Sequence, residues 1–307
     1  MKRASIVYNH VARNAPGIDV LQAACAAVAA EWEVDILVTD APKHGIELAR
    51  QAFAKGSEAV FACGGDGTIN EVVNGLAGTD CALGVLRGGM GNVFAKEIGV
   101  SRHAERALPD LLNGDRRRFD LGIIDGRRFL LMAGIGMDAS VVRVVPDTWK
   151  KRLGSTSYAI WGAGVVLRHR PRQINMTFDG ESQTARLYWM LIGNTRSYGG
   201  VKKITQDALV DDGQLDAYLF EGRGLGWLAS TAVKLALGRQ NRGGSGISFH
   251  RFKEMSIETP GIPVQADGEY FGETPMTFSV DPQALDVLLP KGRGKELFGA
   301  TALAMSS

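Results

Sequence analysis

Two glycine-rich segments contain the residues best suited to chemistry in this chain. The first is an apolar run that ends in glycines and leads into a helical pattern, AVFACGGDGTINE at residues 59–71. Such a turn exposes backbone N–H groups at the positive end of a helix, where phosphate binds well. Asp66 follows the strand at its carboxyl edge, where open α/β sheets bind ligands, and could hold a magnesium ion or a water on that ion. A tight turn with Thr68 as an ordinary cap is the structural alternative.

The second segment is LRGGMGN at residues 86–92, which follows the next strand-like run. Two glycine loops on neighbouring strands would clamp a nucleotide from both sides, although this loop alone could equally be a simple turn. Neither loop fits GxxxxGK[ST] or GxGxxG, which disfavours a P-loop or an ordinary dinucleotide fold.

The elements that must position these loops alternate between strand and helix. We expect strands at Ser5–Tyr8, Val34–Val38, Ala59–Ala62 and Leu83–Leu86, and helices at Pro16–Glu31, Ile46–Lys55, Thr68–Leu76 and Met90–Ile98. Strands separated by helices imply parallel βαβ units and a doubly wound α/β sheet.

After about Asp120 the pattern changes to strand-like runs that meet at Asp-Gly pairs, a strong hairpin signal. The pairs are Asp125-Gly126, Asp179-Gly180 and Asp212-Gly213, the last within the run Leu209–Leu219, and helix-like segments interrupt them at Ser155–Leu167 and Leu225–Leu237. We therefore expect an α/β domain at residues 1–122, to which the segment at about 291–307 could return, and a mostly antiparallel β-rich domain at residues 123–290.

The composition is that of a folded protein in a reducing compartment. The chain has 307 residues, 45% of them apolar, and a net charge of +2, which excludes a disordered chain and gives no concentrated basic face for nucleic acid. Its 39 glycines are about twice the usual share of about 7%. Cys25, Cys63 and Cys81 form no CxxC pair. With no signal-peptide pattern and no apolar run of membrane-spanning length, we expect a cytoplasmic protein, peripheral at the inner membrane surface.

Five motifs in order resemble the diacylglycerol kinase catalytic-domain family, which includes bacterial lipid kinases, sphingosine kinases and ceramide kinases. GGDGTINEVVNGL at residues 64–76 is similar to the nucleotide-binding signature of that family, and LGVLRGGMGNVFAK at residues 83–96 to its PxGTxNDFAR segment. LMAGIGMDA at residues 131–139 resembles the GxGxDA motif, and QADGE at residues 265–269 the late DGE motif. The remaining block, GN…GGG…PDAxxDDGxLD, resembles Gly193-Asn194, Gly199-Gly200, Asp207-Ala208 and Asp211-Asp212-Gly213.

This resemblance implies a fold and a nucleotide site. The N-terminal domain should resemble NAD kinases and phosphofructokinases, the second domain a β-sandwich, and the active site should lie in the cleft between them. ATP, bound with Mg²⁺, should contact two loops and the ends of the first two strands: Asn9, His10, Thr39, Gly64, Gly65, Asp66, Gly67, Thr68, Asn70, Glu71, Gly89, Met90, Gly91 and Asn92.

The chain departs from the family pattern at three places. His10-Val11-Ala12-Arg13 replaces the usual Pro-x-Ser/Ala-Gly after the first strand. Met90 stands where the family has threonine, and Val93 where an acidic residue is frequent. The last two changes remove polar groups from the second loop. They could indicate altered contacts with the nucleotide or a different lipid head group, and the sequence does not decide between the two.

The resemblance also implies catalytic and metal-binding residues. Glu269 should accept the proton of the lipid hydroxyl, with Asp267 as the second candidate, and a hairpin with solvated acids as the structural alternative. Asp66 and Asp120 are the other candidate catalytic acids. The Leu209 carbonyl, the Asp212 carboxylate and the Gln214 carbonyl match a magnesium site, for which a hairpin without metal is the alternative.

The predicted function is that of an ATP- and magnesium-dependent lipid kinase acting on a hydroxyl of a diacylglycerol-, sphingoid- or ceramide-like lipid. A soluble kinase similar to NAD kinase and a nucleotide-binding module without catalysis are the alternatives. Basic residues at Lys150–Arg152 and Arg168–Arg172 flank a segment with Trp161 and could meet an anionic membrane surface. We expect no transmembrane span, and the oligomeric state stays open, a homodimer included.

Overall fold

The computed structural model describes residues 1–145, 169–197, 204–222, 226–227, 230–231, 233–234 and 246–299. The chain divides into two compact units, one of Met1–Leu121 with Pro282–Ser307 and the other of Gly122–Asp281. Both divisions fall inside long strands, β5 (Asp115–Ile124) and β16 (Met276–Leu289), so these strands contribute residues to both units.

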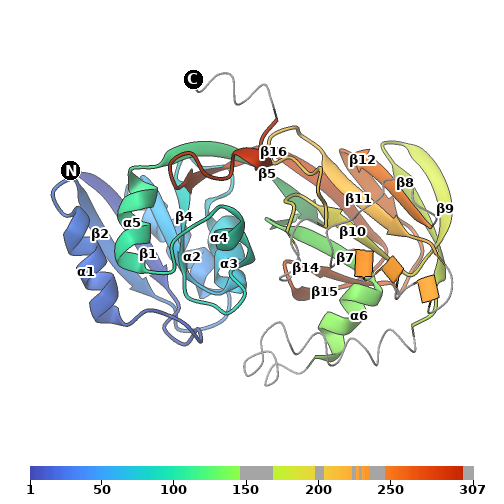
Figure 1. Cartoon of the computed structure of the whole chain (residues 1–307), viewed down its shortest axis with the longest axis horizontal. Helices are drawn as coiled ribbons and strands as arrows, with labels where there is room; N and C mark the ends of the chain where they lie inside the picture. The colour runs from blue at the N-terminus through green and yellow to red at the C-terminus, as the bar shows by residue number, and fades with distance from the viewer. Residues whose placement is uncertain are drawn as a thin grey trace. The chain divides into compact units, whose positions relative to one another are not determined.

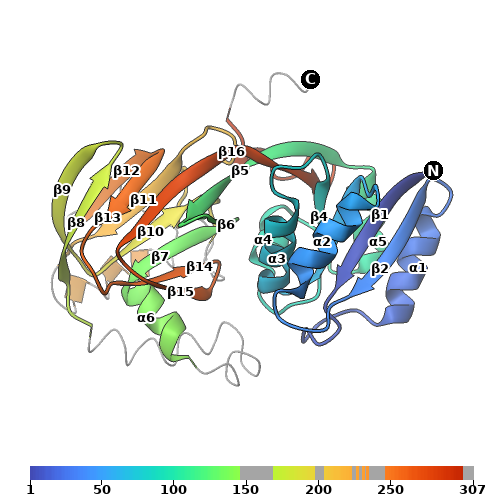
Figure 2. The ribbon, with the colours of Figure 1, turned by 180° about the vertical axis from the view of Figure 1, so that it is seen from behind.

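The first unit contains a parallel sheet in the order β2-β1-β3-β4-β16 (Figure 1). Its other strands are β1 (Lys2–Tyr8), β2 (Trp32–Val38), β3 (Ala59–Gly64) and β4 (Ala82–Arg87). The helices are α1 (Ile18–Val28), α2 (His44–Ala54), α3 (Asp66–Leu76), α4 (Val93–Glu97) and α5 (Ala104–Leu112), followed near the C-terminus by the short 3-10 helix η1 (Lys295–Leu297). Helix α1 packs with α5 on one face of the sheet and α2 with α3 on the other (Figure 2). The expected doubly wound α/β domain is confirmed.

Two predicted helices begin at other residues in the structure. Helix α3 starts at Asp66, two residues earlier than expected, because Gly65 is its extended N-cap. The helix expected from Met90 begins only at Val93, because Asn92 is left-handed with φ 44° and cannot continue a helix backwards. The three residues before Val93 therefore belong to the glycine loop.

In the second unit the described strands form two antiparallel layers. One contains the first half of β16 with β13 (Glu254–Ile257), β8 (Arg172–Phe178) and β9 (Glu181–Leu187), next to β5 and β6 (Arg127–Phe129). The other has the order β12 (Ile247–Phe252), β11 (Leu215–Phe220), β10 (Trp189–Gly193), β7 (Met132–Gly136), β14 (Pro263–Ala266) and β15 (Glu269–Glu273). Apolar residues of both layers form one core, as in a β-sandwich. Helix α6 (Met137–Val144) packs on β7, β14 and β15 (Figure 1).

The Asp-Gly predictions have different outcomes. Strands β5 and β6 form a hairpin around Asp125-Gly126, and β8 and β9 form one around Asp179-Gly180, as expected. The hairpin expected at Asp212-Gly213 is wrong, because β11 begins at Leu215 and pairs with β10 and β12, while the residues before it form turns and bends. The predicted helix Ser155–Leu167 lies outside the described residues, and the described residues of Leu225–Leu237 are helical.

Candidate functional site

Three loops of the first unit meet at one edge of the parallel sheet. Strands β1, β3 and β4 are parallel, so the loops that follow them leave the sheet at the same edge. The Asn9 N–H donates to the Cys63 carbonyl at 2.9 Å, and the Gly88 N–H donates to the Gly64 carbonyl at 3.1 Å. The Asn14 N–H completes the connection by donating to the Gly88 carbonyl at 2.9 Å. The two predicted glycine loops and the loop after β1 thus form one assembly.

The glycines allow the backbones of the two loops to touch. A Cβ atom on Gly89 would lie 2.6 Å from the Cα atom of Gly65, and a Cβ atom on Gly88 would lie 3.0 Å from the Cα atom of Gly64. Contacts below 3.0 Å are not tolerated without a shift of the backbone. The loops therefore present main chain rather than side chains, which is the surface that a phosphate group needs.

Asn92 and Asp66 tie the two glycine loops together. Asn92 is buried, and its Nδ2 donates to the Gly64 carbonyl while its Oδ1 accepts the Gly89 N–H, both at 2.9 Å. Asp66 Oδ1 accepts the N–H of Val93 at 2.9 Å, at the start of α4. Both side chains were predicted to face the nucleotide. In the structure each also fixes the shape of the loops, while the proposed contact of Asp66 with magnesium stays a prediction.

The N-terminus of α3 lies at this edge, directly after β3. Gly65 is the N-cap residue and makes no side-chain capping bond, so Thr68 is not the cap of this helix. Instead, the buried Thr68 Oγ1 accepts a hydrogen bond from Asn9 Nδ2 at 3.1 Å, which joins the helix to the loop after β1. Asn9 Oδ1 is buried and has no hydrogen-bond partner within the described ranges. The N-terminus of α3 fits an anionic ligand, because a helix N-terminus carries positive partial charge, whereas the Asn9 oxygen is an acceptor and fits a donor group of a ligand.

The other predicted nucleotide-binding residues lie around these loops. Glu71 accepts the N–H groups of Lys43 and Gly45, at 2.8 and 2.9 Å, and so holds the start of α2. Asn70 is buried, and its backbone carbonyl accepts a hydrogen bond from Asn74 Nδ2, one turn later in α3. Thr39 is buried at the end of β2, whereas His10 is exposed. Their contacts with a nucleotide stay predictions.

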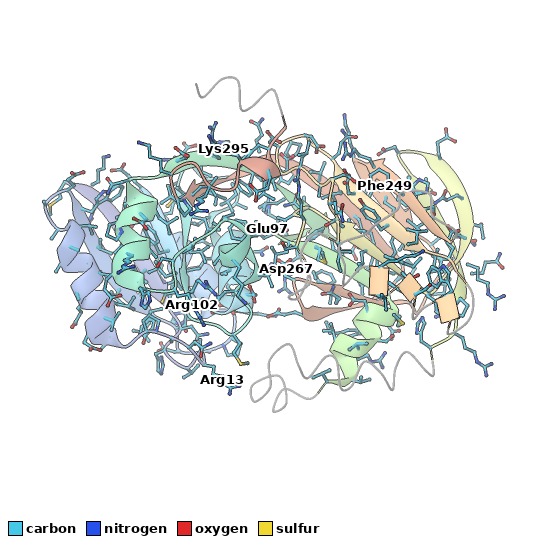
Figure 3. The ribbon with its side chains drawn as sticks, viewed as in Figure 1. Arg13, Glu97, Arg102, Phe249, Asp267 and Lys295 are labelled. Atoms are coloured by element: carbon cyan, nitrogen blue, oxygen red, sulfur yellow. The ribbon has the colours of Figure 1, made fainter. Side chains whose placement is uncertain are left out.

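Sequence reasoning missed Asn14, which holds the loop after β1 against the second glycine loop. Its Nδ2 donates to the Gly89 carbonyl at 3.2 Å, in addition to the backbone bond to Gly88. An asparagine in a loop carries no signal for such a contact. Around the same loop, Arg13 (labelled in Figure 3) donates to the Met90 sulfur at 3.0 Å, and Lys96 donates to the Met90 carbonyl at 3.4 Å.

In the second unit, three predicted segments lie at one end of the six-stranded sheet. Strand β10 ends at Gly193, which is opposite Met132 at the start of β7 and Asp216 near the start of β11. Strand β14 ends at Ala266 beside the same end of β7. The magnesium-loop candidates, the Asn194 segment and the DGE motif therefore follow or precede strand ends on one side of the sheet.

Asp267 is engaged with the backbone at the start of β7. Asp267 (labelled in Figure 3) and Gly268 form the turn between β14 and β15, with φ angles of 49° and 85°. The Asp267 carboxylate accepts the N–H groups of Leu130 and Leu131 at 2.9 Å and of Met132 at 3.1 Å. The hairpin expected as the structural alternative is present, and its aspartate is held in place rather than solvated.

Glu269 has a different environment from Asp267. Its side chain is 54% exposed and pairs with Arg127 at 3.1 Å. Because the oxygens of Asp267 accept backbone N–H groups, Glu269 is the more exposed acid of this motif, and its role as proton acceptor stays a prediction.

Asp120 is fully buried in β5. Its Oδ1 accepts the Gln283 N–H at 2.7 Å, where β16 passes through a residue with φ 48°. The residue therefore stabilises an irregular position of β16, and its role as a candidate catalytic acid stays a prediction.

The loop of Leu209, Asp212 and Gln214 offers only oxygen donors on a half-buried turn. Asp212 Oδ1 accepts the Gln214 N–H at 3.1 Å, so the loop folds back on itself at this carboxylate. Arg251 lies 3.7 Å from Asp212 Oδ2 and balances its charge. Oxygen donors completed by water fit Mg²⁺. Within the described ranges, no group of three or more His, Cys, Asp or Glu side chains forms a metal site, so a cation here would depend on carbonyls.

The predicted membrane-facing residues are covered only in part. Lys150–Arg152, Trp161, Gly199 and Gly200 lie outside the described residues. Four further arginines, at residues 116–118 and 127–128, form ion pairs within the protein: Arg116 with Asp286, Arg118 with Asp80, Arg127 with Glu269 and Arg128 with Asp281. Among the described helices, none combines the length and the apolar character that crossing a bilayer requires.

Sequence comparisons find matches to known domain families in both units. Residues 3–124 match the diacylglycerol kinase catalytic domain, and residues 132–289 match the YegS C-terminal NAD kinase beta sandwich-like domain. A diacylglycerol kinase of Bacillus subtilis is 29% identical over 306 residues, which is 97% of this chain and 99% of that protein. A diacylglycerol kinase of Mycobacterium tuberculosis is 33% identical, over 80% of this chain and 81% of that protein.

Solved structures show the same fold. A crystal structure of a diacylglycerol kinase from Bacillus anthracis matches with a TM-score of 0.71 at 20% identity, covering 94% of this chain and 96% of that one. The expected combination of an α/β domain and a β-sandwich is thereby confirmed, and the match of the second domain is to an NAD kinase beta sandwich-like domain.

Proposed function

Because the chain belongs to the family of diacylglycerol kinases and YegS-type lipid kinases, a family of kinases, we propose that it transfers the γ-phosphoryl group of ATP to a hydroxyl of a lipid. The acceptor is a diacylglycerol-, sphingoid- or ceramide-like lipid, and the names of the two relatives support diacylglycerol first. The observation that carries the proposal is the pair of glycine loops, whose backbones touch at Gly65 and Gly89 beside the N-terminus of α3.

Each unit contributes a different part of this reaction. The loops around Gly64–Thr68 and Gly88–Asn92 bind the phosphates of ATP through backbone N–H groups and the end of α3. Magnesium bound with ATP would neutralise charge on the phosphates. Oxygen donors at Leu209, Asp212 and Gln214 form a further cation site that supports the second unit.

Glu269 is the proton acceptor in this proposal. The lipid hydroxyl oxygen forms a bond to the γ-phosphorus, the bond from that phosphorus to the β–γ bridging oxygen breaks, and ADP leaves. The hydroxyl proton passes to the Glu269 carboxylate. Positioning and charge neutralisation do most of the work in such transfers, and a positioned base typically contributes about 10² to 10⁴ in rate.

The function is tested with purified protein, magnesium and radiolabelled ATP against mixed micelles of diacylglycerol, sphingosine or ceramide, with NAD as a soluble acceptor. We expect a phosphorylated lipid, identified by its mass. Phosphorylation of NAD alone, or ATP hydrolysis without a lipid product, would overturn the proposal.

A matched control for the base lies in the chain itself. Asp179-Gly180-Glu181 is a second DGE tripeptide in a turn of the same kind, with φ angles of 47° and 89°, on the β8–β9 hairpin. Glu269→Gln should lower kcat by roughly 10²-fold or more, whereas Glu181→Gln should leave it unchanged. Equal effects of the two substitutions would remove Glu269 as the base.

A further inference from the structure

The two DGE turns of this chain differ in how the glycine is held. In both turns the aspartate accepts backbone N–H groups of another segment, those of residues 130–132 for Asp267 and those of residues 253–254 for Asp179. In the turn that contains the candidate base, the Gly268 N–H also donates to Gln265 Oε1 at 2.9 Å. No side chain in the described part of the chain does the same for Gly180.

Gln265 is itself oriented by an acid. Its side chain is fully buried, and its Nε2 donates to Asp138 Oδ2 at 2.8 Å. Asp138 is in the first turn of α6, in the GxGxDA-like motif to which no role has been given so far. The side-chain amide of Gln265 therefore uses its acceptor on the turn and its donor on Asp138.

A glycine makes room for this pair. A Cβ atom on Gly134 in β7 would collide with Asp138 Oδ2 and would lie 2.6 Å from Gln265 Nε2. The motif Gly134-Ile-Gly-Met-Asp138 thus combines an acid with the space that the acid and its partner need. The packing therefore accounts for the glycine at position 134 and the aspartate at position 138 of this motif.

The last turn of α6 is attached to the strand that carries Glu269. Arg143 pairs with Glu273 at 2.7 Å and lies over the ring of Tyr270, with its guanidinium carbon 5.6 Å from the ring centroid. Helix α6 and the β14–β15 hairpin are therefore joined at both ends of the helix. A shift of α6 would move the DGE turn.

We propose that Gln265 and Asp138 are positioning residues for phosphoryl transfer, which hold the turn of residues 267–269 where the Glu269 carboxylate can accept the hydroxyl proton. The inference rests on the proposed function. It assigns the acid of the GxGxDA-like motif to the geometry of the base rather than to a ligand. Misplacement of a reacting group by about 1 Å can cost about 10²-fold in rate, so a fixed turn has a measurable effect.

The polarity of the pair allows it to be broken and restored. In Gln265→Glu one oxygen still accepts the Gly268 N–H, but the other faces the Asp138 carboxylate. In Asp138→Asn the new amide oxygen still accepts from Gln265. In the double variant the amide introduced at position 138 donates to the carboxylate introduced at position 265, so the bond is rebuilt with donor and acceptor exchanged.

Steady-state kinetics of these variants test the proposal. We expect kcat to fall by about 10- to 100-fold in Gln265→Glu with the KM for ATP unchanged, because the nucleotide loops are untouched. Asp138→Asn should stay within about threefold of wild type, and the double variant should return to that level, since its hydrogen bond is restored. Wild-type kcat in Gln265→Glu, or a double variant no better than it, would overturn the proposal.

The control is a second glutamine that donates to a carboxylate. On the surface of α2, Gln51 Nε2 donates to Glu47 Oε1 at 3.0 Å, and Gln51→Glu should leave kcat unchanged. Amide hydrogen exchange at Gly268 separates this inference from the proposed function. Repulsion from the Asp138 carboxylate should displace the side chain of Gln265→Glu and weaken its bond to the Gly268 N–H. Faster exchange at Gly268 in this variant, reversed in the double variant, supports the positioning role of the Gln265–Asp138 pair even if Glu269→Gln retains activity and the assigned base is wrong. Unchanged exchange at Gly268 would refute the positioning role of the Gln265–Asp138 pair.

Discussion

Replacement of Asn92 by alanine should loosen both glycine loops at once. Asn92 is 1% exposed, and its side chain makes the two hydrogen bonds that join the Gly64 carbonyl to the Gly89 N–H. Alanine makes neither bond. It also has to adopt the left-handed conformation, with φ 44°, that asparagine tolerates better than most residues.

The size of the effect follows from these terms. The Gly64 carbonyl keeps the hydrogen bond from the Gly88 N–H, and the Gly89 N–H is only partly buried, so loss of the two Asn92 bonds costs about 2 kcal/mol together. Alanine in the left-handed region adds about 1 kcal/mol, and we therefore expect Asn92→Ala to lower the free energy of unfolding of the first unit by about 3 kcal/mol. Asn92→Gly removes the same hydrogen bonds without the conformational strain and should cost about 2 kcal/mol.

Urea unfolding followed by hydrogen exchange in peptides of the first unit measures this loss. The KM for ATP should rise in both variants, since the loops that bind its phosphates lose their connection. An Asn92→Ala protein within about 1 kcal/mol of wild type, with an unchanged KM for ATP, would refute the argument that this side chain holds the loops together.

Two other predictions concern hydrogen-bonded carboxylates and thiols. Asp267→Asn and Asp179→Asn should each destabilise the second unit by about 1 to 3 kcal/mol in urea unfolding, because an amide accepts fewer backbone N–H groups than a carboxylate. Only Asp267→Asn should also lower kcat, and equal kcat values would contradict this assignment. Burial raises the pKa of Cys63 and of Cys81 to about 12, so at pH 8 roughly one thiol in 10⁴ is ionised. A thiol reagent should therefore modify the half-buried Cys25 first and the other two only on unfolding, and equal labelling rates in the folded protein would contradict their burial.

The fold class was predictable because local patterns determine it. Apolar strands separated by helical segments predicted a parallel sheet, and two Asp-Gly pairs predicted real hairpins. The pair at Asp212-Gly213 failed because a turn sequence does not reveal whether a strand precedes it. The start of α4 was missed for a similar reason, since the left-handed Asn92 is stabilised by the Gly64 carbonyl, which is distant in sequence.

The candidate site was predictable as a set of segments and less so as a set of roles. The glycine loops were placed correctly because parallel strands end at the same edge of a sheet. The roles of Asp267 and Glu71 depend on backbone N–H groups elsewhere in the chain, at residues 130–132 and 43–45. A sequence motif cannot show that an acid is already occupied by such groups.

The second DGE tripeptide, at residues 179–181, offers a position at which a new function could be built into the chain. Both copies are first of all stable turns, and a stable turn tolerates change in the residue that follows it. Because Glu181 is exposed, a different side chain at this position should leave the β-sandwich folded. For protein engineering, the β8–β9 turn is accordingly a ready position on which to build a second reactive group.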